Sequence, residues 1–581
     1  MKKITFLLAL LLITSLSYGQ AMSGTYNVGT GEVAPNFTSL KAAADALNAN
    51  GISGDVVLEI TSNLTETESS RIGVITGTNS ITIRPSSDTD YRIELKKSLD
   101  NSRASGLIIV GLTADNWDNL TDGTNNIIVD GYAVGGSTRR LTLATTDATN
   151  IFHGPIQIVG KNTGVVVKNC ILDQRNISSG QSTTYAVRIR IEKNTAGTIF
   201  EPSNVTIENN VITAVKNTAQ IGIGLTAASG ITTNTIAGVI IKNNEINART
   251  RGISMSNNSD ITIEGNIFKT EQVSPGMLST WIQGIANGGG DINIKGNKFI
   301  SALTANTNTG AYGIRGIIAS GGGTWYIDNN FFTGFKVTGT TGVTDMIAIR
   351  CGNTCMIRNN TFYLNSLSAS GIVPVYQGIL IAAGTPTIIN NIMLSDEDAI
   401  ANTLITGTVG GSSDYNNLYL KAGNTNARIN STYTNLADYQ SGTGKDANST
   451  SVDVQFENAA TGDLRIAGTS QQDINLSAPL ISAVSTDILG AVRQDPTYKG
   501  AHQGILPFVA TGVGKQEVAA YHVRSTATGV EVIFEGEATI ELYTINGVLI
   551  NKTNTFNNYS YDLNKGAYII RVNGKATKFV R

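Results

Sequence analysis

A short phrase recurs along the middle of the chain and limits the folds open to it. It consists of a strand-like run of alternating apolar residues, a pair of turn residues and a closing apolar residue, as in VIIKNNEI (239–246). The copies begin at residues 165, 205, 239, 261, 292, 325, 355, 386 and 412. A fixed phrase separated by segments of variable length is typical of a solenoid whose coils carry loops of different length.

The two members of the turn pair follow different rules. The first member is Asn or Gly in all nine aligned copies, and both residue types tolerate left-handed backbone angles. The second member is Asn in eight copies and Cys170 in the other, and it is never Gly. A common Asn-Asn turn would not explain this difference, so we expect the second amide to hydrogen-bond with its counterparts in adjacent coils. This asparagine ladder comprises Asn210, Asn244, Asn266, Asn297, Asn330, Asn360 and Asn391 in its central coils.

The fourth position of the phrase alternates in charge from one copy to the next. Period-two alternation directs this position outward, and parallel stacking would set the charges of adjacent coils side by side. An exposed pair contributes only about 0.2–1 kcal/mol, so we expect these charges to matter chiefly for the register of the coils. The charges are Lys168, Glu208, Lys242, Glu264, Lys295, Asp328 and Arg358.

Further strand-like runs flank each phrase. One precedes it, as in AVRIRIE (186–192), and one follows the turn pair. Parallel strands joined by crossovers are right-handed in nearly all proteins. The sequence therefore predicts an all-β fold, a right-handed parallel β-helix with three strands per coil. The stretch FTSLKAAADALNAN (37–50) spaces apolar residues on one helical face, and we expect it to cap the N-terminal end, within about residues 37–60.

Together these features resemble the pectate-lyase-like superfold and, more narrowly, the secreted β-helix proteins of Bacteroidetes, over about residues 22–505. The stretches SVDVQFENAATGDLRI (451–466) and TDILGAVRQDPTYKGAHQG (486–504) are similar to the closing segment of those proteins. We therefore expect one β-helix domain over residues 20–505 that is closed by about residues 446–505.

The N-terminus shows the pattern of a signal peptide over residues 1–19. Two lysines precede an apolar run, Ile4–Leu16, and a small-residue exit, Ser17–Gly19. No later segment approaches the roughly 20 apolar residues of a membrane-spanning helix, so we expect no transmembrane segment in the mature chain. A formal net charge of −2 gives no electrostatic footprint for nucleic acid. We expect a protein that is secreted or displayed on the outer cell surface.

The C-terminal region has a different sequence pattern from the repeat. After a linker at residues 506–515, residues 516–581 show short alternating strands joined by NG and KG turns, which predicts a small Ig-like β-sandwich. This module resembles the type A sorting domain of the type IX secretion system. The resemblance implies Sec-dependent export, passage across the outer membrane, and the type IX machinery as a partner; a plain β-sandwich is the alternative. The resemblance includes Gly547, Gly566, Tyr568 and Lys578.

Basic residues on the strand before each phrase are candidates for binding a polysaccharide. Arg188 and Arg190 share one outward face with Glu192, and Arg315 and Arg350 occupy the corresponding strand of later coils. Such a row could hold an anionic glycan, because guanidinium groups suit carboxylates and sulfates. Solvated surface arginines are the alternative.

Two further features bear on ligands. Trp281 lies in a long loop and could stack on a sugar ring, although loop aromatics also anchor loops. The stretch DNWDNLTDG (115–123) contains Asp115, Asp118 and Asp122, which are candidates for a calcium site. Its spacing departs from an EF-hand loop, and turn-forming residues explain it as well. We expect no other cofactor.

The three cysteines do not form a disulfide framework. Cys351 and Cys355 are close enough in sequence to bridge in an oxidising compartment, although two strand-edge residues four apart often fail the geometry. Cys170 lies inside the repeat, where a buried small side chain is expected.

These observations favour a binding function over catalysis. The first hypothesis is a secreted or cell-surface β-helix protein, exported by the type IX system, that binds glycans or adheres to surfaces. The second is a polysaccharide lyase or glycoside hydrolase of the β-helix class acting on an anionic polysaccharide. A lyase would need an Arg or Lys base and a carboxylate-neutralising cation on the outer strand surface. The paired aspartates of polygalacturonases are absent from the sequence.

Overall fold

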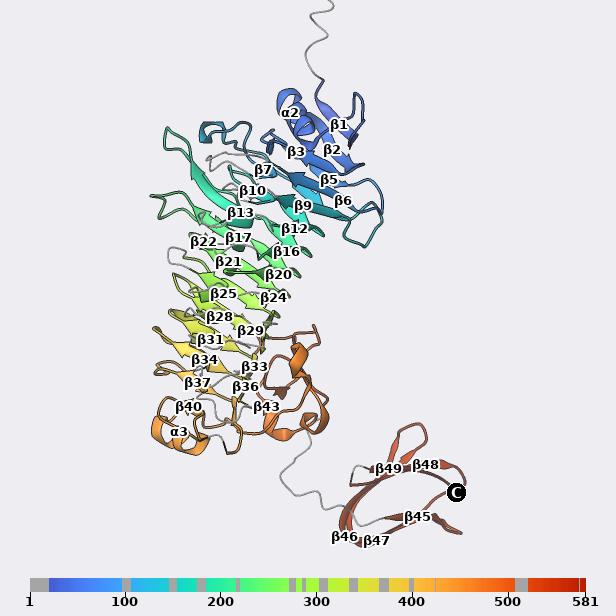
Figure 1. Cartoon of the computed structure of the whole chain (residues 1–581). Coiled ribbons are helices and arrows are strands. Elements are labelled where there is room, and N and C mark those ends of the chain that lie inside the picture. Colours follow the sequence, from blue (N-terminus) through green and yellow to red (C-terminus); the bar gives the residue numbers. More distant parts are fainter. Residues whose placement is uncertain are drawn as a thin grey trace, which may run out of the picture. The chain divides into compact units, whose positions relative to one another are not determined.

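The chain divides near Leu506 into two compact units, each with a hydrophobic core of its own (Figure 1). The computed structural model describes residues 20–581 with internal gaps, and the predicted signal peptide lies outside the described residues. The gaps are residues 97–105, 146–153, 175–183, 216–219, 271–277, 285–288, 302–311, 334–342, 365–375, 396–401, 424, 507–520 and 574.

The first unit is the right-handed parallel β-helix that the sequence predicts, built from three long parallel sheets (Figure 1). Sheet A holds the strands that precede the turn pair: β1 (Met22–Val28), β2 (Ile52–Ile60), β5 (Ile81–Pro85), β8 (Ile127–Asp130), β11 (Val166–Lys168), β15 (Thr206–Glu208), β19 (Ile240–Lys242), β23 (Ile261–Glu264), β26 (Ile292–Lys295), β29 (Thr324–Asp328), β32 (Thr354–Arg358), β35 (Thr387–Ile389) and β38 (Ser413–Asp414).

Sheet B follows the turn pair, and sheet C completes each coil. Sheet B contains β3 (Leu64–Glu66), β6 (Tyr91–Leu95), β9 (Leu141–Thr145), β12 (Ile171–Asp173), β16 (Val211–Ala214), β20 (Glu245–Ala248), β24 (Ile267–Thr270), β27 (Lys298–Ser301), β30 (Phe331–Thr333), β33 (Thr361–Leu364), β36 (Ile392–Ser395) and β39 (Asn417–Leu420). Sheet C contains β4 (Ser70–Ile72), β7 (Ile108–Val110), β10 (Ile156–Ile158), β13 (Thr184–Lys193), β17 (Gln220–Ala227), β21 (Arg251–Met255), β25 (Leu278–Gly284), β28 (Tyr312–Ala319), β31 (Val343–Cys351), β34 (Tyr376–Ile381), β37 (Thr403–Thr406) and β40 (Arg428–Asn430).

An asparagine ladder joins consecutive coils inside the turns between sheets A and B. The Asn210 backbone N–H donates to Asn244 Oδ1 at 2.9 Å, and the Asn244 N–H donates to Asn266 Oδ1 at 2.9 Å. Asn244 Nδ2 also donates to the Ile207 carbonyl at 2.8 Å. Because these amides are buried, this pattern satisfies groups that water cannot reach. It continues through Asn297, Asn330, Asn360, Asn391 and Asn416.

The first member of each turn pair has a left-handed backbone, which explains why only Asn and Gly fill it in the regular copies. The φ angle is 52° at Asn209, 56° at Asn243 and 65° at Gly265. In the last copy, the structure places the turn pair one residue earlier than the sequence alignment does. There Tyr415 has the positive φ, of 55°, and Asn416 rather than Asn417 joins the ladder.

The outward charges of sheet A stack in register along the solenoid. Strand pairing places Lys168, Glu208, Lys242 and Glu264 on neighbouring strands at the same position. Ion pairs join alternate neighbours: Lys168–Asp130 at 3.2 Å, Lys242–Glu208 at 3.0 Å, Lys295–Glu264 at 3.3 Å and Arg358–Asp328 at 2.6 Å. A coil inserted out of order would set like charges together, as the sequence pattern predicts.

Aromatic side chains also stack inside the solenoid, at the position that closes the phrase. The rings of Phe268, Phe299, Phe332 and Phe362 lie nearly parallel, with centroids 4.9, 4.6 and 4.7 Å apart. Stacked aromatics at the strand repeat add dispersion contacts to the buried apolar area.

Both ends of the solenoid are covered. At the N-terminal end, helix α2 (Leu40–Asn50) buries Leu40, Ala43, Ala44 and Leu47, the face expected from its spacing. At the other end lies helix α3 (Leu436–Thr443). Covering the end coils leaves fewer exposed strand edges that could pair with other chains.

After α3 the chain folds back along the outside of the later coils. Short elements β41 (Phe456–Asn458), β42 (Asp463–Ile466), β43 (Ser477–Ala478) and β44 (Thr497–Tyr498) form this closing segment. Its buried Arg493 donates to Asn329 Oδ1 at 2.8 Å. This hydrogen bond joins the closing segment to a turn between sheets A and B. Burial lowers the pKa of Arg493 to about 10.

Two of the three cysteines form a disulfide at the end of β31. Cys351 and Cys355 form a disulfide across the short turn into β32, and both are fully buried. Cys170 is a free, buried thiol, and burial raises its pKa.

The second unit is an antiparallel β-structure of β45 (His522–Ser525), β46 (Gly529–Thr544), β47 (Leu549–Asp562), β48 (Ala567–Val572) and β49 (Lys575–Val580). The long strand β46 pairs with β45 through its first half and with β48 through its second half. Its core includes Val532, Ile540 and Ile570. This agrees with the small β-sandwich expected from the alternating pattern.

Candidate functional site

The outer face of sheet C carries the predicted arginines, and strand register fixes their positions. Arg188 on β13 is in register with Gly224 on β17. Arg315 on β28 is in register with Thr280 on β25, which is in turn in register with Arg251 at the start of β21. These arginines alternate with inward residues of the core, so their side chains leave the sheet on its outer side.

Arg188 is the most unusual charged residue on this face. It is only 5% exposed, and its guanidinium lies over the Tyr185 ring, 5.1 Å from the ring centroid. Nε donates to Thr226 Oγ1 at 3.2 Å, while the buried Nη1 has no hydrogen-bond partner. A buried guanidinium without a carboxylate is costly, because the desolvated charge is not repaid by an ion pair. Arg188 is therefore not a solvated surface side chain.

Arg190 and Glu192 form a neutral pair beside it. Their side chains share an ion pair through Arg190 Nε and a Glu192 carboxylate oxygen, and both residues are buried. Glu192 also sits where β13 pairs with the short antiparallel strand β14 (Ile199–Phe200). Because Glu192 pairs with Arg190, no ion pair within the described ranges neutralises the charge of Arg188.

Two residues that the sequence did not single out complete this part of the face. The Tyr185 ring lies over Gly224, where an added Cβ would come within 2.2 Å of a ring carbon. Arg251 stands two strands away, and burial lowers its pKa while Tyr185 opposes that shift. We call Tyr185, Arg188, Arg190, Glu192 and Arg251 the arginine cluster. Extending the alternation of GISM back by one residue would have placed Arg251 on the strand.

The other two predicted arginines do not join the cluster. Arg315 lies on β28, four strands from Arg188, and Arg350 lies on the next strand, β31. Arg350 is in register with Ile318 rather than with Arg315, which sets it three residues further along the face. Both are partly exposed. Strand register thus places Arg188 and Arg350 in one row of the face and Arg251 and Arg315 in a second row, three residues away, instead of in one compact cleft.

Trp281 corrects the sequence prediction. It is 2% exposed, belongs to the core and packs against Phe299 with ring centroids 5.7 Å apart. The reason is that Trp281 lies on strand β25 and not in the loop expected from the sequence, and both Trp281 and the following Ile282 are buried in the core. It is not available to stack on a sugar.

The three candidate calcium ligands contact different partners. Asp115 pairs with Arg71, Asp118 accepts from the Thr195 backbone N–H at 2.8 Å, and Asp122 pairs with Lys161 at 2.9 Å. In the described part of the chain, no group of three or more His, Cys, Asp or Glu residues is placed to hold a metal ion. Arg71 belongs to β4, whereas Lys161 and Thr195 follow β10 and β13, so these contacts tie the loop to three other coils.

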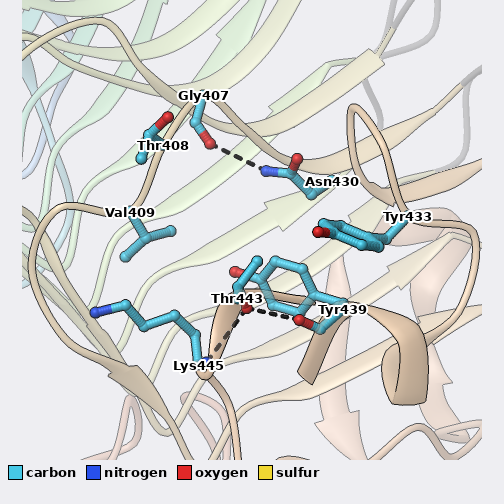
Figure 2. A pocket seen from close by; sticks show the side chains of 8 residues that line it. All are labelled: Gly407, Thr408, Val409, Asn430, Tyr433, Tyr439, Thr443 and Lys445. Atoms are coloured by element: carbon cyan, nitrogen blue, oxygen red, sulfur yellow. Dashed lines mark hydrogen bonds between the residues drawn. The ribbon is translucent and has the colours of Figure 1, made fainter. Parts of the chain in front are cut away.

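A pocket of about 320 Å³ lies between α3 and the last coils, lined by Gly407, Thr408, Val409, Asn430, Tyr433, Tyr439, Thr443 and Lys445 (Figure 2). Most of its polar groups are engaged within the chain. Asn430 Nδ2 donates to the Gly407 carbonyl at 3.0 Å, and Lys445 Nζ donates to the Gly411 carbonyl at 2.6 Å. The buried Tyr439 hydroxyl has no partner. The pocket therefore lies where the helix of the end cap meets the last coils.

The fold defines the chain as a parallel β-helix protein. No protein-family model matches it, and no curated protein matches it. Among solved structures it is similar to pectate lyase Pel9A, with 13% identity, a TM-score of 0.31, and 84% of this chain and 98% of that chain covered. It is also similar to a pentasaccharide complex of the tailspike protein of Escherichia coli bacteriophage HK620, with 13% identity, a TM-score of 0.28, and 93% and 86% covered. At such scores these likenesses say nothing about the site.

No helix in the part of the chain that the structure describes combines the length and apolar character needed to cross a membrane.

Proposed function

We propose that this protein binds an anionic glycan on the outer face of sheet C, and that Arg188 supplies the central contact. One observation carries the proposal: the Arg188 guanidinium is buried on that face, lies against Tyr185 and has an Nη1 with no hydrogen-bond partner. The chain pairs the neighbouring Arg190 with Glu192 but supplies no ion pair to Arg188 among the described residues.

An acidic sugar meets the chemical needs of this arrangement. A carboxylate or sulfate oxygen would accept from Nη1 in a charge-assisted hydrogen bond, which contributes about 1.5–3 kcal/mol. The Tyr185 ring places aromatic surface beside the charge, and aromatic rings pack against the apolar face of a sugar. Removal of the Arg188 charge should therefore weaken binding at least tenfold.

The test compares full-length native protein with Arg188→Gln by titration against an anionic polysaccharide and an uncharged polysaccharide of similar length. Arg524→Gln is the matched control, since Arg524 is an exposed arginine of the second unit. We expect affinity for the anionic polymer only, a loss in Arg188→Gln, and none in Arg524→Gln. Equal binding by all three proteins would refute the proposal.

A second candidate function, a polysaccharide lyase, is favoured by the position of Arg251 on the outer face of sheet C in the register row of Tyr185, where burial also lowers the Arg251 pKa. Burial destabilises the protonated guanidinium, and a lyase needs a basic group to remove a proton next to a uronate carboxyl group. Absorbance of the unsaturated product during incubation with alginate or pectate distinguishes the two candidates. Turnover that is lost in Arg251→Gln would establish the lyase; binding without turnover supports the first proposal.

We also propose that the protein reaches the cell surface or the medium by the type IX route. The support is the sequence resemblance of residues 516–581 together with a C-terminal unit that has its own core. Gly547 lies in a tight turn with a φ of 82°, and Tyr568 Oη donates to the Asn564 carbonyl at 3.0 Å. Deleting residues 516–581 in the native host should retain the protein inside the cell. Normal export of the truncated chain would contradict this route.

A further inference from the structure

Arg188 lies at the edge of a part of sheet C that is covered from outside. Strand register places Arg188 on β13 beside Gln157 on β10, and Gln157 beside Ile109 on β7. All three alternate with residues of the solenoid core, so they face outward. Gln157 and Ile109 are nevertheless fully buried. A second layer of the chain therefore covers the two strands on the N-terminal side of Arg188.

A loop, residues 111–123, forms this second layer together with β14. Its apolar residues pack on the outer face of the sheet in a cluster that is separate from the solenoid core. The buried members are Ile109, Leu112, Leu120 and Val159, with Trp117 and Phe200 packed against them. We call residues 111–123 and β14 the wall.

Two contacts extend the wall along β13. Asp118 Oδ1 accepts from the Thr195 backbone N–H at 2.8 Å and from Thr195 Oγ1 at 2.6 Å, which joins the loop to the hairpin between β13 and β14. Phe200 of β14 is in register with Glu192, which follows Arg188 on the same face of β13. The wall therefore bounds Arg188 on two sides, over β10 and at the end of β13.

Towards the C-terminal coils the face continues with small or uncharged residues. The register partners of Arg188 on the next three strands are Gly224 on β17, Ser254 on β21 and Gln283 on β25. The Tyr185 ring lies over Gly224 and supplies aromatic surface in this direction. A glycan held at Arg188 can thus extend over β17 and β21, whereas in the opposite direction it meets the wall.

We infer, on the basis of the glycan-binding function proposed above, that Arg188 binds the acidic sugar at one end of a glycan chain. An acidic sugar in the interior of a chain along the solenoid axis has neighbours on both sides, and one of them would overlap the wall. A terminal sugar has one neighbour, so its carboxylate or sulfate reaches Arg188 Nη1 while the rest of the chain lies over β17 and β21. The two ends of a glycan differ chemically, so each chain offers one matching end.

The experiment titrates full-length protein with two fractions of polygalacturonate that differ strongly in chain length, and it counts the protein molecules bound per chain at saturation. Every sugar of this polymer carries a carboxylate, so interior positions far outnumber ends. We expect one protein molecule per chain in both fractions. Arg188→Gln should weaken binding to both.

A shortened wall supplies a second arm. Replacing residues 113–119 with Gly-Gly removes the exposed part of the loop and keeps Leu112 and Leu120, which pair in an antiparallel bridge. This variant should bind the short fraction like the native protein, and the number of molecules bound per chain should now rise with chain length. The double substitution Asp453→Asn and Glu457→Gln removes the same number of negative charges at exposed positions of the closing segment, so it is the matched control and should behave like the native protein.

The outcomes separate this inference from the function on which it rests. A number of native molecules per chain that rises with chain length would overturn end recognition and leave anionic glycan binding intact. Absence of binding to both fractions would overturn both. A count that stays at one per chain after the wall has been shortened would also overturn the inference, because something other than the wall would then limit the ligand.

Discussion

Adjacent asparagines of one turn have different physical tasks. Asn243 is exposed and supplies a left-handed backbone, whereas buried Asn244 joins three coils through its side chain. The same amino acid is therefore chosen once for φ and once for its amide. This division of roles makes a sharp test possible with two neighbouring substitutions.

Asn244→Ala should destabilise the β-helix by roughly 3 kcal/mol, since it orphans the Asn210 N–H and the Ile207 carbonyl at about 1–3 kcal/mol for each buried group. Asn243→Gly is the matched control and should change stability little, because Gly already fills this slot at Gly265 and Gly296. Chemical denaturation of both variants measures the difference. Equal effects would contradict the ladder.

A second residue-scale prediction concerns pH. His502 Nδ1 accepts from the Ile466 backbone N–H at 3.1 Å, so this contact needs an unprotonated ring nitrogen, and burial lowers the His502 pKa. A lowered histidine pKa means that the unfolded chain binds the proton more readily. The stabilisation is therefore complete above the ordinary histidine pKa of about 6.5 and is lost as pH falls through the lower folded value.

His502→Gln should flatten this pH dependence in thermal unfolding between neutral and mildly acidic pH. His522→Gln, in the exposed first strand of the second unit, is the control and should keep the native profile. An unchanged profile in His502→Gln would contradict the assignment.

At the scale of single elements, the packing of β17 beneath β13 positions the arginine cluster. The Tyr185 ring rests on Gly224, and Arg188 rests on that ring. A side chain at position 224 would push the ring and the guanidinium away from the sheet. Strand β17 therefore helps to form the site because Gly224 has no side chain and leaves room for the Tyr185 ring.

Gly224→Ala should weaken glycan binding about tenfold, because a Cβ would lie 2.2 Å from a Tyr185 ring carbon and displace Arg188. Gly289→Ala is the control, since a Cβ there meets no atom within 4 Å. The same glycan titration measures both. Native affinity in Gly224→Ala would show that the cluster does not depend on this packing.

Sequence patterns predicted the elements well where one rule governed each position. The alternating runs, the turn slots and the face of α2 are local and repeat from coil to coil, so they could be predicted without coordinates. The prediction for Trp281 failed because this residue was expected in a loop, whereas it lies on β25 with its side chain in the core. Tyr415 failed because the last turn places a bulky residue at a positive φ, which the other copies avoid.

The sequence predicted only part of the candidate site, because the rest depends on side-chain contacts and on the register between strands. The pattern places Arg188 and Arg190 on the outer face, but which of them is paired depends on the reach of Glu192. The separation of Arg315 from Arg350 depends on register between strands, which one sequence does not reveal. Tyr185 and Arg251 were missed because each stands at the end of a strand.

At the scale of the whole molecule, the chain consists of a long solenoid and a small antiparallel unit with separate hydrophobic cores. Neighbouring coils of the solenoid pair through three sheets, and the coils from Cys170 to Asn416 are also joined by the amide ladder. Such redundancy gives a rigid outer face on which ligand contacts can repeat at the strand spacing.

Separate cores predict separate unfolding. Calorimetry of the full chain should show two transitions, and a chain that ends at residue 506 should lose one of them and keep the other. A single transition that shifts as a whole on truncation would contradict the independence of the two units.

A structure of the full-length protein with a bound anionic oligosaccharide tests the central claim most directly. The proposal predicts a carboxylate or sulfate oxygen within hydrogen-bonding distance of Arg188 Nη1, beside the Tyr185 ring. A glycan seated in the pocket beside α3, or anywhere that leaves the Arg188 guanidinium untouched, would contradict it.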